Sequence, residues 1–386
     1  MYKTFAIINI VLASHSFLAA FLLFVKKSNQ EANRYLGIIN LVMGVLFLTA
    51  YLSLDRFYSQ PALLVYLIIP LVFFITPLCY LYTFRLARTE TKNDGYHFIP
   101  ACIAVIYVML RWNTGLRQPR IFIEEIFSLH YIPFDLYLLL QIGLLMLAMY
   151  LLKMLMIVRT YNKGIKHVYS SIEKTNLQWL QIHLGFGVCG SFIFFLTNIM
   201  QFLLPPELNP ILNRVEYAGQ AFSIVFLLSI VYFTFIQADI GEETREEREI
   251  KKRGSSPAYA RQRLGEEKER EYADLLLACM KERQPFLDPE LTVQDLAEIL
   301  DISAAHLTMV LNICLKKNFY QFINYYRVQY AGKLLTDTRM ENENILTVAL
   351  ESGFNSKSSF NTYFKKIQHM TPREYRQRSA GRTMEK

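Results

Sequence analysis

Five polar residues near the end of the chain are spaced to share one face of a helix. They are Lys357, Ser358, Asn361, Thr362 and Lys365. Hydroxyl and amide groups can hydrogen bond to base edges in the major groove, and ammonium groups can pair with phosphates. This face is short, polar and basic. The chemistry it indicates is the binding of double-stranded DNA by a helix laid in the major groove.

The residues around this face predict a helix-turn-helix that positions it. Ser356 is a natural N-cap for the helix, and Gly353 stands where the chain must turn, because glycine takes positive φ at little steric cost. A short helix precedes the turn, and apolar residues recur at helical spacing on both helices. The buried or anchoring positions predicted for this unit are Ala349, Phe354, Phe360 and Phe364.

A similar pattern occurs earlier in the chain. Thr292 and Asp295 predict a capping box, and Ser303 predicts the start of a second helix. Ala297 and Leu307 fall on the predicted buried stripe of this first copy. The outward face of its second helix is predicted to contact DNA through Ala305, Thr308, Met309 and Asn312. Alanine, threonine and methionine favour contact with thymine methyl groups over bidentate recognition of guanine.

The two copies are joined by residues 319–335, which predict one long amphipathic helix, and the second copy is followed by a Thr-Pro-x-x-Tyr-Arg motif. This arrangement closely resembles the DNA-binding domain of the AraC/XylS family of transcription regulators, over roughly residues 271–378. The residues that carry the resemblance are Leu296, Ala297, Ser303, Leu307, Arg327, Ala331, Leu335, Ala349, Gly353, Phe354, Ser358, Phe360, Phe364, Lys365, Lys366, Thr371, Pro372, Tyr375 and Arg376. The resemblance implies two recognition helices in successive major grooves.

Three positions depart from the family pattern. The family usually has glycine where this chain has Lys316 and His369, so both helix ends are expected to differ locally. The position of Thr362 is often arginine in the family, so a phosphate or guanine contact is expected to be missing here. From Ser303 onward there are thirteen Lys and Arg against six Asp and Glu, a balance that suits DNA but also anionic lipid.

The first 236 residues have a different character. The chain is 53% hydrophobic with a mean hydropathy of +0.20, too high for an ordinary soluble protein. Five cysteines without metal-ligand spacing indicate neither zinc nor disulfides. Seven apolar runs predict transmembrane helices, at about 5–25, 35–54, 62–84, 96–110, 133–158, 182–204 and 215–236. A signal peptide is the alternative for the first run, and the fourth run is the shortest.

The predicted fold is therefore all-α, with a seven-helix transmembrane bundle at 1–236, a charged linker at 237–264 and an AraC/XylS-type domain at 265–386. With the N-terminus outside, the inner loops hold ten Lys and Arg and the outer segments six. A DNA-binding C-terminus must also be cytoplasmic. Both arguments predict a multi-pass protein of a bacterial inner membrane with its N-terminus outside.

Polar residues inside the apolar runs have two interpretations. A ligand pocket or proton path is one, and hydrogen bonding between helices is the other. The residues concerned are Asn9, His15, Asn40, Gln141, His183, Asn198, Gln201 and Gln220. The outer loop Arg111–His130 is a second place where a signal could bind. The apolar face of the helix after Gly265 either packs on the DNA-binding domain or forms a dimer seam.

The function predicted is a membrane-anchored, sequence-specific transcription regulator, a one-component sensor without enzymatic activity or cofactor. No zinc, nucleophile-elbow or phosphate-loop motif occurs in the chain. The expected partners are double-stranded DNA, the lipid bilayer, RNA polymerase, a second copy of the chain and an unknown signal ligand. The alternatives are a transporter or receptor with an autoregulatory DNA-binding tail, and a tether that senses nothing.

Overall fold

The computed structural model describes residues 2–54, 61–87, 95–115, 134–203, 228–229, 231–237 and 265–384. These residues form helices, and an isolated antiparallel bridge joins Tyr169 and Thr292. The all-α class is thus confirmed for the described part of the chain. The chain divides into two compact units, Met1–Arg159 with Leu177–Gly241, and Thr160–Asn176 with Glu242–Lys386. The predicted linker 237–264 lies outside the described residues apart from Gln237.

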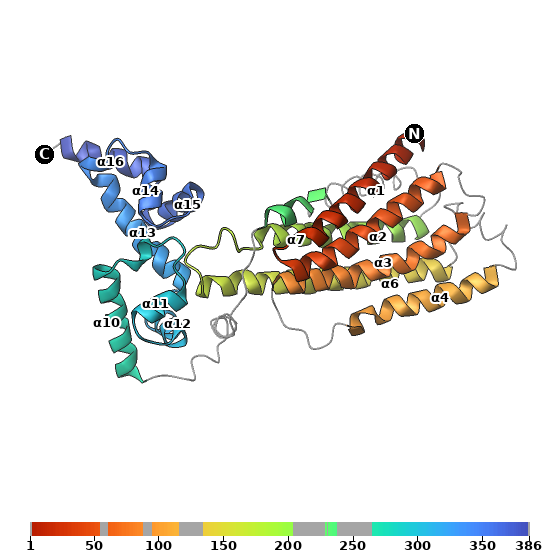
Figure 1. Ribbon diagram of the computed structural model, residues 1–386, viewed down its shortest axis with the longest axis horizontal. Helices are drawn as coiled ribbons and strands as arrows, with labels where there is room; N and C mark the ends of the chain where they lie inside the picture. Colours follow the sequence, from red (N-terminus) through yellow and green to blue (C-terminus); the bar gives the residue numbers. More distant parts are fainter. Residues whose placement is uncertain are drawn as a thin grey trace. The chain divides into compact units, whose positions relative to one another are not determined.

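The first unit is built from long apolar helices. They are α1 (Tyr2–Val25), α2 (Gln30–Leu54), α3 (Pro61–Leu86), the short η1 (Gly95–Phe98), α4 (Ile99–Gly115), α6 (Phe134–Gly164) and α7 (Gln178–Leu203). Helix α1 packs along α2, α2 along α3 and α3 along α4 (Figure 1). Helix α6 runs past the boundary of this unit at Arg159 and ends in the second one.

Four helices of the described residues are long and apolar enough to cross a membrane. The stretches concerned are Ile7–Val25, Gln30–Thr49, Gln141–His167 and Gln178–Thr197, and a shorter apolar one is Gly95–Leu110. Large apolar side chains face outward on them, for example Phe21 at 63% exposure and Met109 at 66%. Exposed apolar surface on this scale is compatible with a lipid environment. The count of seven stays a prediction, because most of the last run lies outside the described residues.

Polar groups within this unit connect its segments. The imidazole Nε2 of His183 lies 2.8 Å from the hydroxyl of Ser229, and the Tyr82 hydroxyl lies 2.9 Å from that of Thr234. Asn40 donates to the Leu36 carbonyl within its own helix. The His183 contact is a hydrogen bond between helical segments, which is one of the two interpretations that the sequence analysis gave for these polar residues. The side chains of Asn198, Gln201 and Gln220 and the loop after residue 115 lie outside the described part.

The second unit holds two helix pairs on one long helix. Its elements are η2 (Ile165–His167), α10 (Glu266–Glu282), η5 (Pro285–Leu287), α11 (Val293–Ile299), α12 (Ala304–Ile313), α13 (Phe319–Thr336), η6 (Thr338–Met340), α14 (Ile345–Glu351), α15 (Lys357–Gln368) and α16 (Pro372–Met384). Helix α13 starts at a capping box between Asn318 and Gln321. Its N-terminal half packs with α10 and with the first helix pair, α11 and α12. Its C-terminal half packs with the second helix pair, α14 and α15, and with α16.

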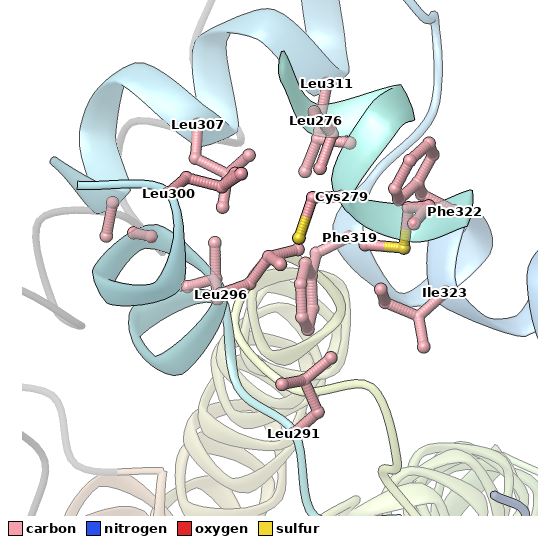
Figure 2. Packing of buried hydrophobic residues seen from close by; sticks show 14 of the residues in the cluster. Leu276, Cys279, Leu291, Leu296, Leu300, Leu307, Leu311, Phe319, Phe322 and Ile323 are labelled. Carbon is pink, nitrogen blue, oxygen red and sulfur yellow. The ribbon is translucent and has the colours of Figure 1, made fainter. Parts of the chain in front are cut away.

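The two halves have separate hydrophobic cores. Figure 2 shows side chains of α10, α11, α12 and α13 meeting in the first core. Leu276, Cys279 and Met280 of α10 are buried there, so α10 packs on the core of its own unit, one of the two alternatives for this helix. The second core gathers Ala349, Phe354, Phe360 and Phe364 around α13.

Candidate nucleic-acid interface

Helix α15 presents the polar face from which the sequence analysis began. Its start is fixed by Ser356, whose hydroxyl accepts the backbone N–H of Ser359 at 3.2 Å. Phe360 and Phe364 are fully buried on one side. The five predicted contact residues, Lys357, Ser358, Asn361, Thr362 and Lys365, are all exposed, as is Lys366. The groups of these five residues are thus free of the protein core and share one face of a rigidly packed helix.

The turn before α15 is held by backbone hydrogen bonds and by crowding. The N–H of Gly353 donates to the Leu350 carbonyl and that of Phe354 to the Ala349 carbonyl, both at 3.0 Å, which is a Schellman motif. Gly353 has φ of 83°. A Cβ on this residue would lie 2.4 Å from the carbonyl oxygen of Phe286. Both the positive φ and the close approach require glycine here.

Aromatic contacts and helix α16 stabilise the buried side of α15. Phe354 contacts Phe360 and Phe364 contacts Tyr375, each pair with ring centroids 5.3 Å apart. Pro372 is buried at the start of α16, and Arg376 donates to the carbonyls of Glu341 and Glu343 at 3.3 and 2.6 Å. The Thr-Pro-x-x-Tyr-Arg motif therefore ties α16 to α15 and to the segment that leads into α14.

The first helix pair repeats this local design. The capping box of Thr292 and Asp295 starts α11, and the Ser303 hydroxyl accepts the N–H of His306 at 3.2 Å to start α12. The turn between them bends the chain by 102°. Ile302 donates its N–H to the Ala297 carbonyl at 3.0 Å, as Phe354 does to Ala349 in the second pair. Ala297 and Leu307 are buried, as the sequence predicted.

The face predicted for α12 is less accessible than that of α15. Ala305 and Asn312 are partly buried, while Thr308 and Met309 are only 2% and 5% exposed. The Thr308 hydroxyl donates to the Ala304 carbonyl of its own helix at 2.8 Å. For Thr308 and Met309 to contact bases directly, the residues that cover them would have to move. The DNA contacts of all four residues stay a prediction.

Lys316 and His369 keep the backbone that glycine normally adopts at these helix ends. Their φ angles are 53° and 58°, in the left-handed region. His369 is the C-cap of α15. The departure from the family pattern is therefore one of side chain and not of backbone path, and each residue carries the strain of a non-glycine side chain at positive φ.

Arg327 has a structural importance that the helical pattern did not indicate. It lies on α13 and is only 1% exposed. Its Nε donates to the Phe286 carbonyl at 2.8 Å and its Nη2 to the Asp288 carbonyl at 2.7 Å. Burial lowers the pKa of its guanidinium to about 10, so the group stays charged at neutral pH. The sequence marked Arg327 only as part of the family resemblance, and periodicity assigns no partners to a buried charge.

Comparisons with known proteins agree with this domain. Residues 296–378 match the family model of a helix-turn-helix domain. An uncharacterized HTH-type transcriptional regulator of Staphylococcus aureus (strain COL) is 36% identical over 87 residues, which is 22% of this chain and 11% of that protein. The melibiose operon regulatory protein of Escherichia coli (strain K12) is 33% identical over 95 residues, 25% of this chain and 30% of that protein. No solved structure matches the chain.

The matches show a helix-turn-helix domain in the C-terminal part of the chain, similar to parts of proteins named as regulators, and support a DNA-binding transcription regulator. The chain spans less than a third of the length of the curated relatives that it matches. The apolar first unit lies outside the matched residues.

Proposed function

We propose that this protein is a membrane-anchored regulator of transcription whose C-terminal unit binds specific DNA through two helix-turn-helices, α11–α12 and α14–α15. The observation that carries the proposal is the exposed polar and basic face of α15, held by a Schellman turn and two buried phenylalanines. In this arrangement Asn361 and Ser358 contact base edges, and Lys357 and Lys365 contact phosphates.

The apolar helices of the first unit anchor the regulator in the membrane in this proposal. Four described helices of sufficient length and hydropathy support the anchor. The proposed topology has seven spans with the N-terminus outside and the DNA-binding unit in the cytoplasm of a bacterium. We also propose that the protein contacts RNA polymerase, pairs with a second copy of itself and binds a signal ligand. A signal that changes how membrane parts associate would change the local concentration of paired DNA-binding units.

The DNA-binding part of the proposal is tested by separating base contacts from phosphate contacts. The full-length protein is used to select its binding sites from genomic DNA, and the variants Asn361→Ala, Ser358→Ala and Lys365→Ala are then compared on those sites. Lys365→Ala should weaken binding on all sequences and lower the salt-dependence slope by about 1. Asn361→Ala and Ser358→Ala should change which base is preferred.

Lys281→Ala, which changes an exposed lysine on α10, is the matched control for these variants. Equal, sequence-independent loss from all three would show that α15 contacts only the DNA backbone.

The membrane topology is tested with reporter fusions. Fusions after Ser59 and Leu208 should behave as extracytoplasmic and fusions after Thr91 and Lys166 as cytoplasmic. Reversed activity at the first pair would show that the number of spans before that point is wrong.

A further inference from the structure

The connection between two apolar helices belongs to the DNA-binding unit. Residues 160–176 lie between the main parts of α6 and α7, yet they form one compact unit with residues 242–386. We call residues 165–176 the α6–α7 loop. Helix α6 ends at Gly164 and α7 begins at Gln178, so the loop that joins these two apolar helices belongs to the unit that carries α15.

The loop pairs with the chain that leads into α11. The N–H of Ser170 donates to the Leu291 carbonyl at 3.2 Å, and the N–H of Val293 donates to the Val168 carbonyl at 2.8 Å. These bonds flank the antiparallel bridge of Tyr169 and Thr292. Val168 is fully buried in the core of α10, α11, α12 and α13. A residue between two membrane-type helices thus fills part of the core of the first helix pair.

The loop also accepts hydrogen bonds from two buried polar side chains of α13, those of Arg327 and Asn324. The Ser170 carbonyl accepts from Arg327 Nη1 at 3.2 Å and from Asn324 Nδ2 at 3.1 Å, and the Ser170 hydroxyl lies 3.0 Å from Arg327 Nη2. Arg327 also donates to the carbonyls of Phe286 and Asp288. Without the loop, a buried guanidinium would lose half of these hydrogen bonds, which is unfavourable for a charge with little access to water.

A third contact reaches the turn that leads into α15. The side-chain amide of Asn355 donates to the hydroxyl of Ser171 at 2.9 Å and to the Glu290 carboxylate at 3.1 Å. Asn355 lies between the turn at Gly353 and the N-cap of α15 at Ser356. Lys174 of the loop pairs with the same Glu290 at 3.3 Å. The loop therefore contacts the first helix pair, the joining helix and the turn that leads into α15.

We infer that the docked α6–α7 loop holds the two helix pairs in the arrangement that binds DNA, and that it transmits changes in α6 and α7 to α15. The inference rests on the proposed function, since it assigns to the loop a role in regulating the DNA-binding face. The surface that receives the loop is formed by residues 286–293, by α13 and by Asn355, and its occupant is this segment of the same chain. Release of the loop leaves Arg327 without Ser170 and Asn355 without Ser171, so both helix pairs lose a shared support.

The test uses the full-length protein and two independent measurements. Hydrogen exchange at the Ser170 and Val293 amides reports docking, and DNA affinity reports the arrangement of the helix pairs. Val168→Asp should speed exchange at both amides. If about a tenth of the molecules stay docked, the apparent DNA affinity should fall about ten-fold. Lys163→Ala, at an exposed residue just before the loop, should change neither measurement. Faster exchange with unchanged DNA affinity would overturn the inference.

A second variant tests the docked state without disturbing the core. Ser171→Cys and Asn355→Cys are combined in a chain whose native cysteines are replaced by alanine, and the oxidised and reduced forms are compared. We expect the pair to cross-link and the oxidised form to bind DNA at least as tightly as the reduced form. Failure to cross-link, or ten-fold weaker binding after oxidation, would overturn the inference. A wild-type protein with protected loop amides but no DNA binding would instead contradict the proposed function and leave the docking intact.

Discussion

The pairs α11–α12 and α14–α15 turn with equivalent backbone hydrogen bonds, yet Asp301 stands in the first turn where Gly353 stands in the second. Both residues have positive φ, at 53° and 83°. Asp301 is exposed, whereas a Cβ on Gly353 would meet the backbone of residues 286 and 287 at 2.4 to 3.0 Å. The turn itself therefore tolerates a side chain. Glycine is required in the second pair because another segment approaches it closely.

The helices that follow the two turns also differ in accessibility. All five predicted contact residues of α15 are exposed, while Thr308 and Met309 of α12 are buried. Similar capping and turn geometry thus leads to two different surfaces. A local motif specifies how a helix starts and turns, and its surroundings specify what it can bind.

The largest effect should come from adding a methyl group at the crowded turn. Gly353→Ala combines strain at positive φ with overlap against the Phe286 carbonyl, so we expect it to destabilise the second helix pair by about 3 kcal/mol. Asp301→Ala should change stability by about 0.5 kcal/mol or less, since it keeps the same φ in open surroundings. Denaturant unfolding of both variants measures the difference. Equal destabilisation would show that φ alone explains the glycine.

The next effect concerns the two candidate DNA faces. Asn361→Ala should change base preference at one position of the binding site by about 2 kcal/mol, because its amide is exposed on α15. Asn312→Ala is the matched change on α12, where the amide is partly buried, and should have a smaller effect. Competition binding with single-base variants of the site measures both. A larger effect at Asn312 would reverse the ranking of the two helices.

A smaller, stabilising effect is expected at the helix ends that lack glycine. His369→Gly and Lys316→Gly should each stabilise the unit by about 0.5–1 kcal/mol, because glycine relieves the strain of a side chain at φ of 58° and 53°. Thermal unfolding of the single variants and of the double variant checks this. His369→Ala is the control, since alanine keeps the Cβ and should give no such gain. A loss of stability in either glycine variant would contradict the strain argument.

The smallest effect should be a pH dependence at the start of α16. Hydrogen bonds with the backbone and side chain of Thr371 hold the pKa of Glu374 below its ordinary value. A carboxylate with a lowered pKa in the folded state contributes stability above its ordinary pKa, and this contribution disappears as the pH falls through the lowered value. Wild type should therefore exceed Glu374→Gln in unfolding temperature at pH 7, and the difference should shrink at about pH 3. A constant difference would rule out the carboxylate as its source.

The sequence predicted much of the local structure of the C-terminal unit. The caps at Ser303 and Ser356, the capping box at Thr292 and the buried stripe through Phe360 and Phe364 all occur as expected. These features depend on neighbours three or four residues apart, so helical periodicity contains the information for them. The same holds for the apolar helices, whose length and composition are readable without a partner. The domain boundaries and the number of spans stay predictions.

Only the tertiary structure decided which segments meet. Ser170 contacts Arg327 across 157 residues of sequence, and Phe286 of η5, before the first helix pair, lies close to Gly353. No periodic pattern records such contacts, because each segment satisfies its own local preferences whether or not the other is present. The sequence by itself therefore determined which helices form and which face of α15 is polar. Packing between distant segments requires glycine at position 353 and supplies the hydrogen-bond partners of Arg327. It also determines which residues of α12 are accessible.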